Sequence, residues 1–282
     1  MKAGIMNENF EGIFSTNAWK SVALQIIKRD GIVKMPSLTT EQVTEFVNYL
    51  HDKPVVNAHV QAKATLPSAS LSTALKIREW PMMCHTMNDI VSAPYFFELA
   101  VSMLDFVKQY FDDETPKLYS MNGFWTQPAS GEQYLDTHWW HRDGDDRKQL
   151  ALFLFGTDVL KTQDGAHLYQ KGTHRIPDTA LPDGKGGLRH YEKPPYECLV
   201  TMVGAAGTVF ASDPGGLHMG LRPTLVEGER HKTRLLVWAR YGVSDMPASY
   251  QWDRMHPVPK AVLGARYPKN PQICNQIKLV VS

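Results

Sequence analysis

Apolar residues recur at three- and four-residue intervals in three stretches of the first 115 residues, a pattern typical of amphipathic helices. Residues 18–29 form the first stretch. The second begins after Thr39, which forms a capping box with Gln42 three residues later. Residues 95–111 form the third and predict the clearest helix of the chain. We expect these apolar side chains, aromatic ones included, to pack in a core.

Short runs of β-type residues dominate the chain after Pro116 and alternate with clusters of Gly, Pro, Asp and Ser. The predicted strands cover residues 31–35, between the first two helices, and then 118–126, 133–141, 148–156, 166–170, 197–203, 208–211 and 234–243. Closely spaced short strands indicate a sandwich or barrel rather than a βαβ sheet. We therefore expect a mainly β (α+β) fold, with helices packed on a jelly-roll body.

Two regions have no long periodicity. Prolines interrupt residues 52–94, which predicts loops and short elements there, and four more prolines follow Tyr250, which predicts an irregular tail. We expect one domain over residues 1–282. Its expected parts are a mostly helical support (1–115), a jelly-roll core (116–243) and an irregular C-terminal tail (244–282).

Composition narrows the class of protein. The chain has 282 residues, 43% of them apolar, and a formal net charge of +1, so it can bury a large core. Because a general polyanion binder carries a basic surplus, we expect no nucleic-acid partner. The three cysteines are far apart, which argues against a disulfide framework and a thiolate zinc site. With no signal-like N-terminal segment and no long apolar run, we expect a cytoplasmic protein without membrane contact.

The candidate chemistry centres on His141-Arg142-Asp143, the only His-x-Asp in the sequence. On a strand, residues i and i+2 project to the same face, so the imidazole and the carboxylate would converge. His218, which follows the predicted strand 208–211, is the best third ligand from another strand. Two histidines and one carboxylate on one face form the triad suited to Fe(II), with positions left for a chelating cosubstrate and oxygen.

Two other histidine groups are weaker candidates. His190 and Glu192 have the same spacing, but glycines precede them and prolines follow them, so they are expected in a loop. His138 would face the other side of a regular strand from His141, which favours a core or supporting histidine over a ligand.

Several motifs in order resemble the phytanoyl-CoA dioxygenase-like branch of the Fe(II)/2-oxoglutarate-dependent oxygenases. The motifs are residues 30–36, the capped helix, His141-Arg142-Asp143, residues 164–175, His218 and residues 234–241. Two positions depart from the family pattern. Lys171 replaces a proline in a turn, and Gly220 replaces the Ser or Thr that in many relatives supports the cosubstrate carboxylate, so another donor would have to serve.

The resemblance implies a double-stranded β-helix, which is a cupin-like jelly roll, with Fe(II) held by His141, Asp143 and His218. It also implies 2-oxoglutarate and O2 as cosubstrates, with release of succinate and CO2, and a basic residue that anchors the far carboxylate of 2-oxoglutarate. A guanidinium suits that role because it donates two parallel hydrogen bonds.

Three arginines compete for the anchoring role: Arg222, Arg230 and Arg234. In the family the arginine opens the strand after the distal histidine, which favours Arg234. Counting positions from the histidine favours Arg230 instead, and it stays as the rival. Because Asp143 is retained, the resemblance implies hydroxylation or another oxidation rather than halogenation.

Two other functions stay open: a zinc hydrolase that uses the same two histidines and carboxylate, and a catalytically silent jelly-roll scaffold or binding protein. A small-molecule substrate is the default expectation. Four aromatic residues are candidates for the substrate pocket: Tyr119, Trp125, Trp139 and Trp140. No motif identifies the substrate, the position oxidised or the oligomeric state.

Overall fold

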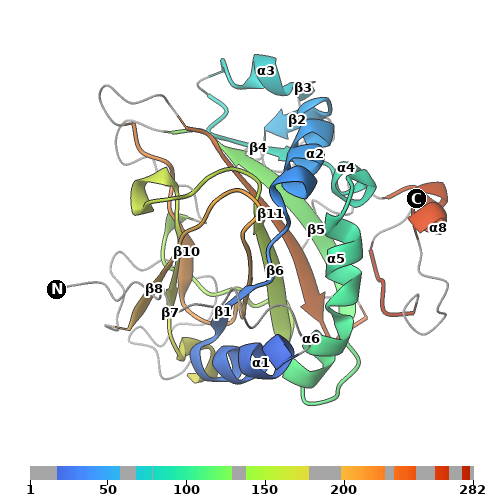
Figure 1. Ribbon diagram of the computed structural model, residues 1–282, viewed down its shortest axis with the longest axis vertical. Helices are drawn as coiled ribbons and strands as arrows, with labels where there is room; N and C mark the ends of the chain where they lie inside the picture. Colours follow the sequence, from blue (N-terminus) through green and yellow to red (C-terminus); the bar gives the residue numbers. More distant parts are fainter. Residues whose placement is uncertain are drawn as a thin grey trace.

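The computed structural model describes residues 18–57, 68–77, 79–128, 138–177, 198–225, 232–245, 258–266 and 275–279. Within these residues the strands form two antiparallel sheets (Figure 1). The larger sheet has the order β1 (Ile32–Met35), β9 (Val209–Ser212), β6 (Gln149–Phe155), β11 (Arg234–Gly242), β5 (Lys117–Thr126), β4 (Met82–His85), β2 (Pro54–Asn57) and β3 (Ser68–Ser70). The smaller sheet has the order β10 (His218–Gly220), β7 (His167–Gln170) and β8 (Leu199–Met202).

The strand order confirms the expected jelly roll. β5, β11, β6 and β9 are neighbours in the larger sheet although they are far apart in the sequence. The smaller sheet is extended beyond β10 by a single antiparallel bridge between His141 and His218. Of the predicted strand 133–141, only this end lies in the described residues, and it pairs at one point rather than along a full ladder.

Helices cover the face of the larger sheet that lies away from the smaller one (Figure 1). They are α1 (Ala18–Asp30), α2 (Thr40–His51), α3 (Leu71–Ala74), α4 (Met87–Ser92), α5 (Phe96–Ser102), α6 (Leu104–Tyr110) and α8 (Lys260–Arg266). Thr39 and Gln42 form the expected capping box at the start of α2. The helix predicted over residues 95–111 is divided into α5 and α6, because the Met103 amide bonds to Ala100 in a tighter turn.

The side chains of β11 alternate between two hydrophobic clusters. Leu235, Val237, Ala239 and Tyr241 pack against the helices, together with residues of α2, α4, α5 and α6. Leu236 and Trp238 face the interior between the two sheets, where they meet Phe153 and Phe210. Since alternate residues of a strand point to opposite faces, Arg234 and Arg240 share this interior face.

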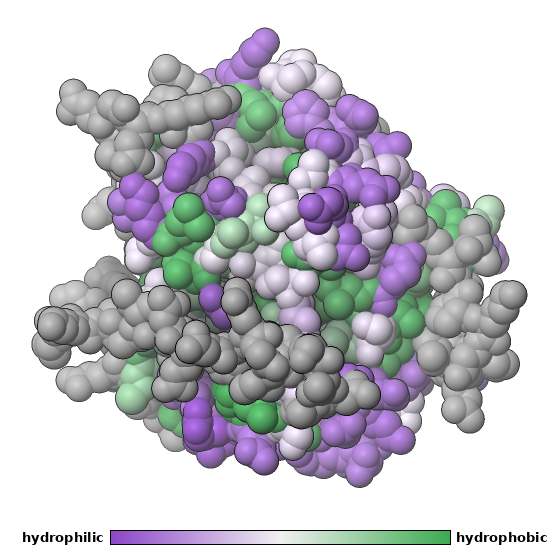
Figure 2. Space-filling view, in the orientation of Figure 1, coloured by the Kyte–Doolittle hydropathy of each residue, from purple (hydrophilic) through white to green (hydrophobic). Residues whose placement is uncertain are grey.

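The region 52–94 contains short elements, as expected, but its three strands extend the larger sheet beyond β5. The tail is less irregular than predicted. It contributes α8 and a parallel bridge between Ile277 and Leu118. None of the described helices is both long and apolar enough to span a membrane. The surface in Figure 2 mixes polar residues with smaller apolar patches.

Candidate functional site

The structure brings His141, Asp143 and His218 together at the junction of the two sheets. His141 and His218 exchange both backbone hydrogen bonds, at 2.9 and 3.0 Å, and the Asp143 amide donates to the Pro214 carbonyl at 2.8 Å. The two Nε2 atoms lie 3.6 and 4.0 Å from the Asp143 carboxylate. One donor atom from each residue lies within 4.8 Å of the others, which is the arrangement a single metal ion requires.

Backbone carbonyls fix the orientation of both histidine rings. His141 Nδ1 lies 2.6 Å from the Trp139 carbonyl oxygen, and His218 Nδ1 lies 2.9 Å from that of Gly216. Because a carbonyl only accepts, each Nδ1 carries the hydrogen, and each Nε2 directs its lone pair toward Asp143. Burial, reinforced by His141, lowers the pKa of His218 to about 4, so at neutral pH this imidazole is in the neutral form that binds metals.

The carboxylate of Asp143 is held ionised by Arg240. Burial by itself would raise the pKa of Asp143, but the charge and hydrogen bond of Arg240, together with the charges of His218 and His141, outweigh it, and the pKa lies below its ordinary value. Arg240 Nη1 is 2.9 Å from Asp143 Oδ2 and also pairs with Asp145, which accepts a hydrogen bond from Tyr119. The sequence analysis did not single out Arg240. It lies six residues after Arg234 on the same face of one strand, but this spacing by itself does not identify Asp143 as its partner.

Arg142 points away from the three converging side chains, as its position in the motif predicts. Its guanidinium donates to the carbonyls of Gly215, Thr173 and Ile176, the last two at 2.8 Å. It therefore ties the His141-Asp143 segment to the loop that precedes His218. In the same loop Gly216 lies against the Tyr169 hydroxyl, and a Cβ there would be only 1.9 Å from that oxygen. This position has no room for a side chain.

Arg234 lies at the end of β11 and is buried, with 5% of its surface exposed. Its Nη1 donates to the carbonyls of Gly165 and Leu221 at 2.6 and 3.0 Å, and its Nη2 donates to Thr126 Oγ1 at 3.3 Å. Burial lowers its pKa to about 10, which leaves it a cation at neutral pH. Among the described residues no carboxylate pairs with it. A buried cation without a counter-ion is costly, so this position favours an anionic ligand.

The other sequence candidates have different outcomes. Arg222 is only partly buried, and its Nε donates to the Gln127 carbonyl at 2.9 Å. Arg230, and the pair His190 and Glu192, lie outside the described residues. His138 is buried but is not part of the metal-compatible group. Burial, together with the charges of Arg234 and Arg222, lowers the pKa of His138 to about 3.

The structure separates the aromatic candidates for the pocket. Trp125 faces the helices, where its Nε1 donates to His85 at 2.9 Å, so it does not line the interior. It lies on the helix-facing side of β5, and only the alternate residues of that strand face inward. Trp140 packs in the interior cluster, whereas Trp139 is partly buried. Lys171, the departure in the turn, forms an ion pair with Asp30 at 3.5 Å.

The interior also contains polar atoms without a hydrogen-bond partner in the described part of the chain. They include Arg234 Nε, Trp238 Nε1 and His167 Nε2. Because buried polar atoms are nearly always paired in folded proteins, this grouping fits a bound polar ligand between the sheets. None of these three atoms belongs to the metal-compatible group, so the ligand they fit is additional to the metal.

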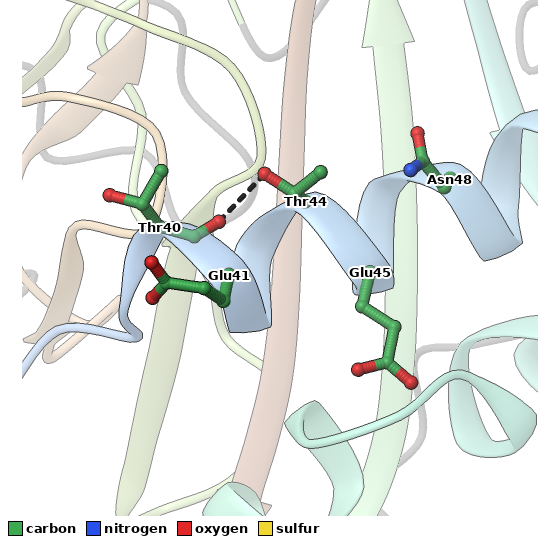
Figure 3. A pocket seen from close by; sticks show the side chains of 5 residues that line it. All are labelled: Thr40, Glu41, Thr44, Glu45 and Asn48. Carbon is green, nitrogen blue, oxygen red and sulfur yellow. Dashed lines mark hydrogen bonds between the residues drawn. The ribbon is translucent and has the colours of Figure 1, made fainter.

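A separate hollow lies on the outer surface, along α2 (Figure 3). The residues that line it are Thr40, Glu41, Thr44, Glu45 and Asn48, all of them exposed. Thr44 donates to the Thr40 carbonyl at 2.7 Å within the helix, and Glu45 accepts from the Tyr95 hydroxyl. This hollow contains no grouping of catalytic residue types and lies on a different element from the converging ligands.

No protein-family model matches the chain, and no curated protein matches it significantly. Solved structures do. The epimerase SnoN, in complex with Fe3+, alpha-ketoglutarate and nogalamycin RO, aligns with a TM-score of 0.55 at 16% identity over 80% of this chain and 84% of its own. The carbocyclase SnoK from nogalamycin biosynthesis aligns with a TM-score of 0.53 at 14% identity over 78% and 82%. HygX from Streptomyces hygroscopicus, with nickel and 2-oxoglutarate bound, aligns with a TM-score of 0.51 at 14% identity, over 81% of this chain and 87% of its own. The chain thus shares the jelly-roll fold of these non-heme 2-oxoglutarate-dependent enzymes.

Proposed function

We propose that the protein is an Fe(II)/2-oxoglutarate-dependent dioxygenase that oxidises a small molecule. The observation that carries the proposal is the pairing of two features within one interior. Two Nε2 atoms and a carboxylate converge as for a metal, and within the part of the chain that the structure describes no carboxylate pairs with the buried cation Arg234. The shared fold with enzymes crystallised with 2-oxoglutarate supports the same function.

The residues fit the implied groups. His141, Asp143 and His218 would hold Fe(II), and Arg234 with the Thr126 hydroxyl would receive the far carboxylate of 2-oxoglutarate. When bound, the iron and its cosubstrates supply oxidation of the substrate by O2, coupled to conversion of 2-oxoglutarate to succinate and CO2.

The protein's own contribution is orientation and exclusion of water. The Trp139 and Gly216 carbonyls hold the histidine rings, and Arg240 holds Asp143 ionised. Aromatic rings line the interior, among them Phe153 stacked on Phe210 with centroids 4.9 Å apart. Such a lining keeps bulk water from a reactive centre.

The finer assignment follows the sequence resemblance. On that resemblance we propose that the protein belongs to the phytanoyl-CoA dioxygenase-like branch, with hydroxylation as the expected reaction because Asp143 occupies the carboxylate position. A small-molecule substrate is supported by the complex of SnoN with nogalamycin RO. The proposal also includes a single oxygenase domain over residues 1–282 in the cytoplasm.

An anaerobic titration tests the function. The purified protein receives Fe(II) and then 2-oxoglutarate, and the weak visible charge-transfer band of the chelate is recorded. We expect the band in wild type and its loss in Asp143→Ala. In Arg234→Ala we expect 2-oxoglutarate affinity to fall on the order of 10- to 100-fold, because charge-assisted hydrogen bonds are lost.

Arg230→Ala is the matched control and should leave 2-oxoglutarate affinity unchanged. If Arg230→Ala weakens binding and Arg234→Ala does not, the anchor is assigned to the wrong arginine. A wild-type protein that binds zinc tightly but forms no band with Fe(II) and 2-oxoglutarate would instead support the hydrolase. A protein that binds no metal at all would support the silent scaffold.

A further inference from the structure

His167 and Gly220 are paired across the smaller sheet. In the antiparallel ladder between β7 and β10, His218 lies opposite Tyr169 and Gly220 lies opposite His167. Residues two apart on a strand share a face, so His167 lies on the same face of the sheet as His218. The ring of His167 stacks on that of His218, with centroids 5.6 Å apart. The imidazole thus lies beside the metal-compatible group, over a position that lacks a side chain.

Arg234 reaches the same end of this strand pair. Its Nη1 donates to the carbonyl of Gly165, two residues before His167, and to that of Leu221, one residue after Gly220. The His167–Gly220 pair is therefore flanked by the two carbonyls that hold the guanidinium. A ligand between the metal and Arg234 would pass along this pair.

The described residues around His167 give no reason for an imidazole, rather than an apolar side chain, at this position. Its ring is 3% exposed and contacts Phe153 and Phe210, with centroids 5.1 and 5.3 Å away. Its Nε2 is buried without a hydrogen-bond partner in the described residues. An apolar side chain would fill such a site without the free-energy cost of an unpaired buried polar atom. A ligand that hydrogen-bonds to the ring removes that cost.

We infer that the His167 imidazole donates a hydrogen bond to the distal carboxylate of bound 2-oxoglutarate, beside Arg234 and in the place that a side chain at Gly220 would take. The inference rests on the proposed function and adds a binding residue to it. His167 supplies the donor that the sequence leaves unassigned at Gly220.

Binding titrations with two ligands test the role of His167. The probes are 2-oxoglutarate and 2-oxovalerate, which has the same chelating end and a methyl group in place of the distal carboxylate. In His167→Leu, the band from Fe(II) with 2-oxoglutarate should require about tenfold more ligand, because a hydrogen bond to a charged group is lost. Binding of 2-oxovalerate and of Fe(II) alone should not change.

A second substitution tests the cross-strand relation. Gly220 is in a strand and is not among the glycines with positive φ, so its backbone conformation is open to serine. Adding Gly220→Ser to His167→Leu should therefore restore much of the 2-oxoglutarate affinity. His167→Gln keeps an amide donor in a similar volume and should lose less affinity than His167→Leu, which also guards against a folding defect in the leucine variant. His51→Leu, on the exposed end of α2, is the matched control and should bind as wild type.

The outcomes separate the inference from the function on which it rests. If wild type forms the band but His167→Leu binds 2-oxoglutarate equally well, or loses both ligands equally, the assigned role of His167 is wrong and the dioxygenase function stands. If wild type binds Fe(II) and neither oxoacid, the function fails and the inference fails with it.

Discussion

At the scale of residues, the hydrogen bond that one nitrogen of each histidine ring makes determines which nitrogen is left to bind a metal. The carbonyls of Trp139 and Gly216 occupy Nδ1 of His141 and His218, so that both Nε2 atoms face Asp143. Arg240 orients the carboxylate of Asp143 through an ion pair. These three contacts prepare the ligand atoms in direction and charge before any metal binds.

Arg240→Met should lower metal affinity about 10- to 100-fold, the range found when groups that orient metal ligands are removed. The physical reason is that Asp143 loses the cation that keeps it ionised and positioned. Isothermal titration with Co(II) under anaerobic conditions measures the effect. Arg240→Lys keeps the charge and should retain part of the affinity. Arg147→Met, which removes an exposed ion pair with Glu114, should leave it unchanged. Equal affinities in all variants would show that Arg240 does not position Asp143.

The metal-compatible residues could be predicted from the sequence. The spacing of His141 and Asp143 and the position of His218 after a strand were enough to select three side chains that meet in the structure. Arg240 could not be selected in the same way. A single arginine in a strand has no local pattern that separates a partner of Asp143 from an outward-facing charge.

At the scale of elements, β11 serves two purposes through the alternation of its side chains. One face packs on the helices and the other carries Arg234 and Arg240 into the interior. Within the described residues the strand pairs with β5 and β6 along nearly its whole length, so both arginines are held by a central strand. This rigidity suits a binding site.

Substitutions of two adjacent leucines of β11 should distinguish an effect on stability from an effect on 2-oxoglutarate binding. Leu235→Ala and Leu236→Ala should each lower the free energy of unfolding by about 2–5 kcal/mol, because both side chains are buried. Only Leu236→Ala should also weaken 2-oxoglutarate binding, since Leu236 faces the interior between Arg234 and Trp238. Urea denaturation and the charge-transfer titration measure the two effects. Weakened binding in Leu235→Ala alone would contradict the assignment of faces.

The elements differ in how far sequence patterns revealed them. Helices α1 and α2 follow from periodicity and the capping box because both are local properties. The strands β2 and β4 were not predicted, since their hydrophobic runs are short and prolines flank them. They form because the edge of β5 supplies hydrogen-bond partners for β4, which pairs in turn with β2.

At the scale of the whole molecule, the helical layer is tied to the loop that carries His218. Tyr110, the last residue of α6, donates to the Asp213 carboxylate at 2.6 Å, and the Gly215 amide donates to the same group at 2.8 Å. Burial nevertheless raises the pKa of Asp213 to about 6. Below about pH 6 the Asp213 carboxyl is therefore protonated in the native state, whereas in the unfolded chain it releases its proton near pH 4.

This difference predicts a pH dependence of global stability. Between about pH 4 and pH 6 the native state binds more protons at Asp213 than the unfolded state, so stability falls as pH rises. Relative to Asp213→Asn, which does not titrate, wild type should lose at most about 3 kcal/mol across this window. Chemical denaturation of both proteins at several pH values measures the difference. Parallel profiles would show that the carboxyl is not protonated in the native state.

The sequence by itself determined the helices, the alternating strands and the residue types of the candidate site. Hydrophobic period, capping and short-range spacing are local quantities that a linear chain displays directly. The tertiary structure decided which partner each group meets. Arg240 reaches Asp143 and His167 lies opposite Gly220 only because the jelly roll places distant strands side by side. Contacts of this kind depend on sheet register and on the packing of two sheets around one interior, and neither can be predicted from a local sequence pattern.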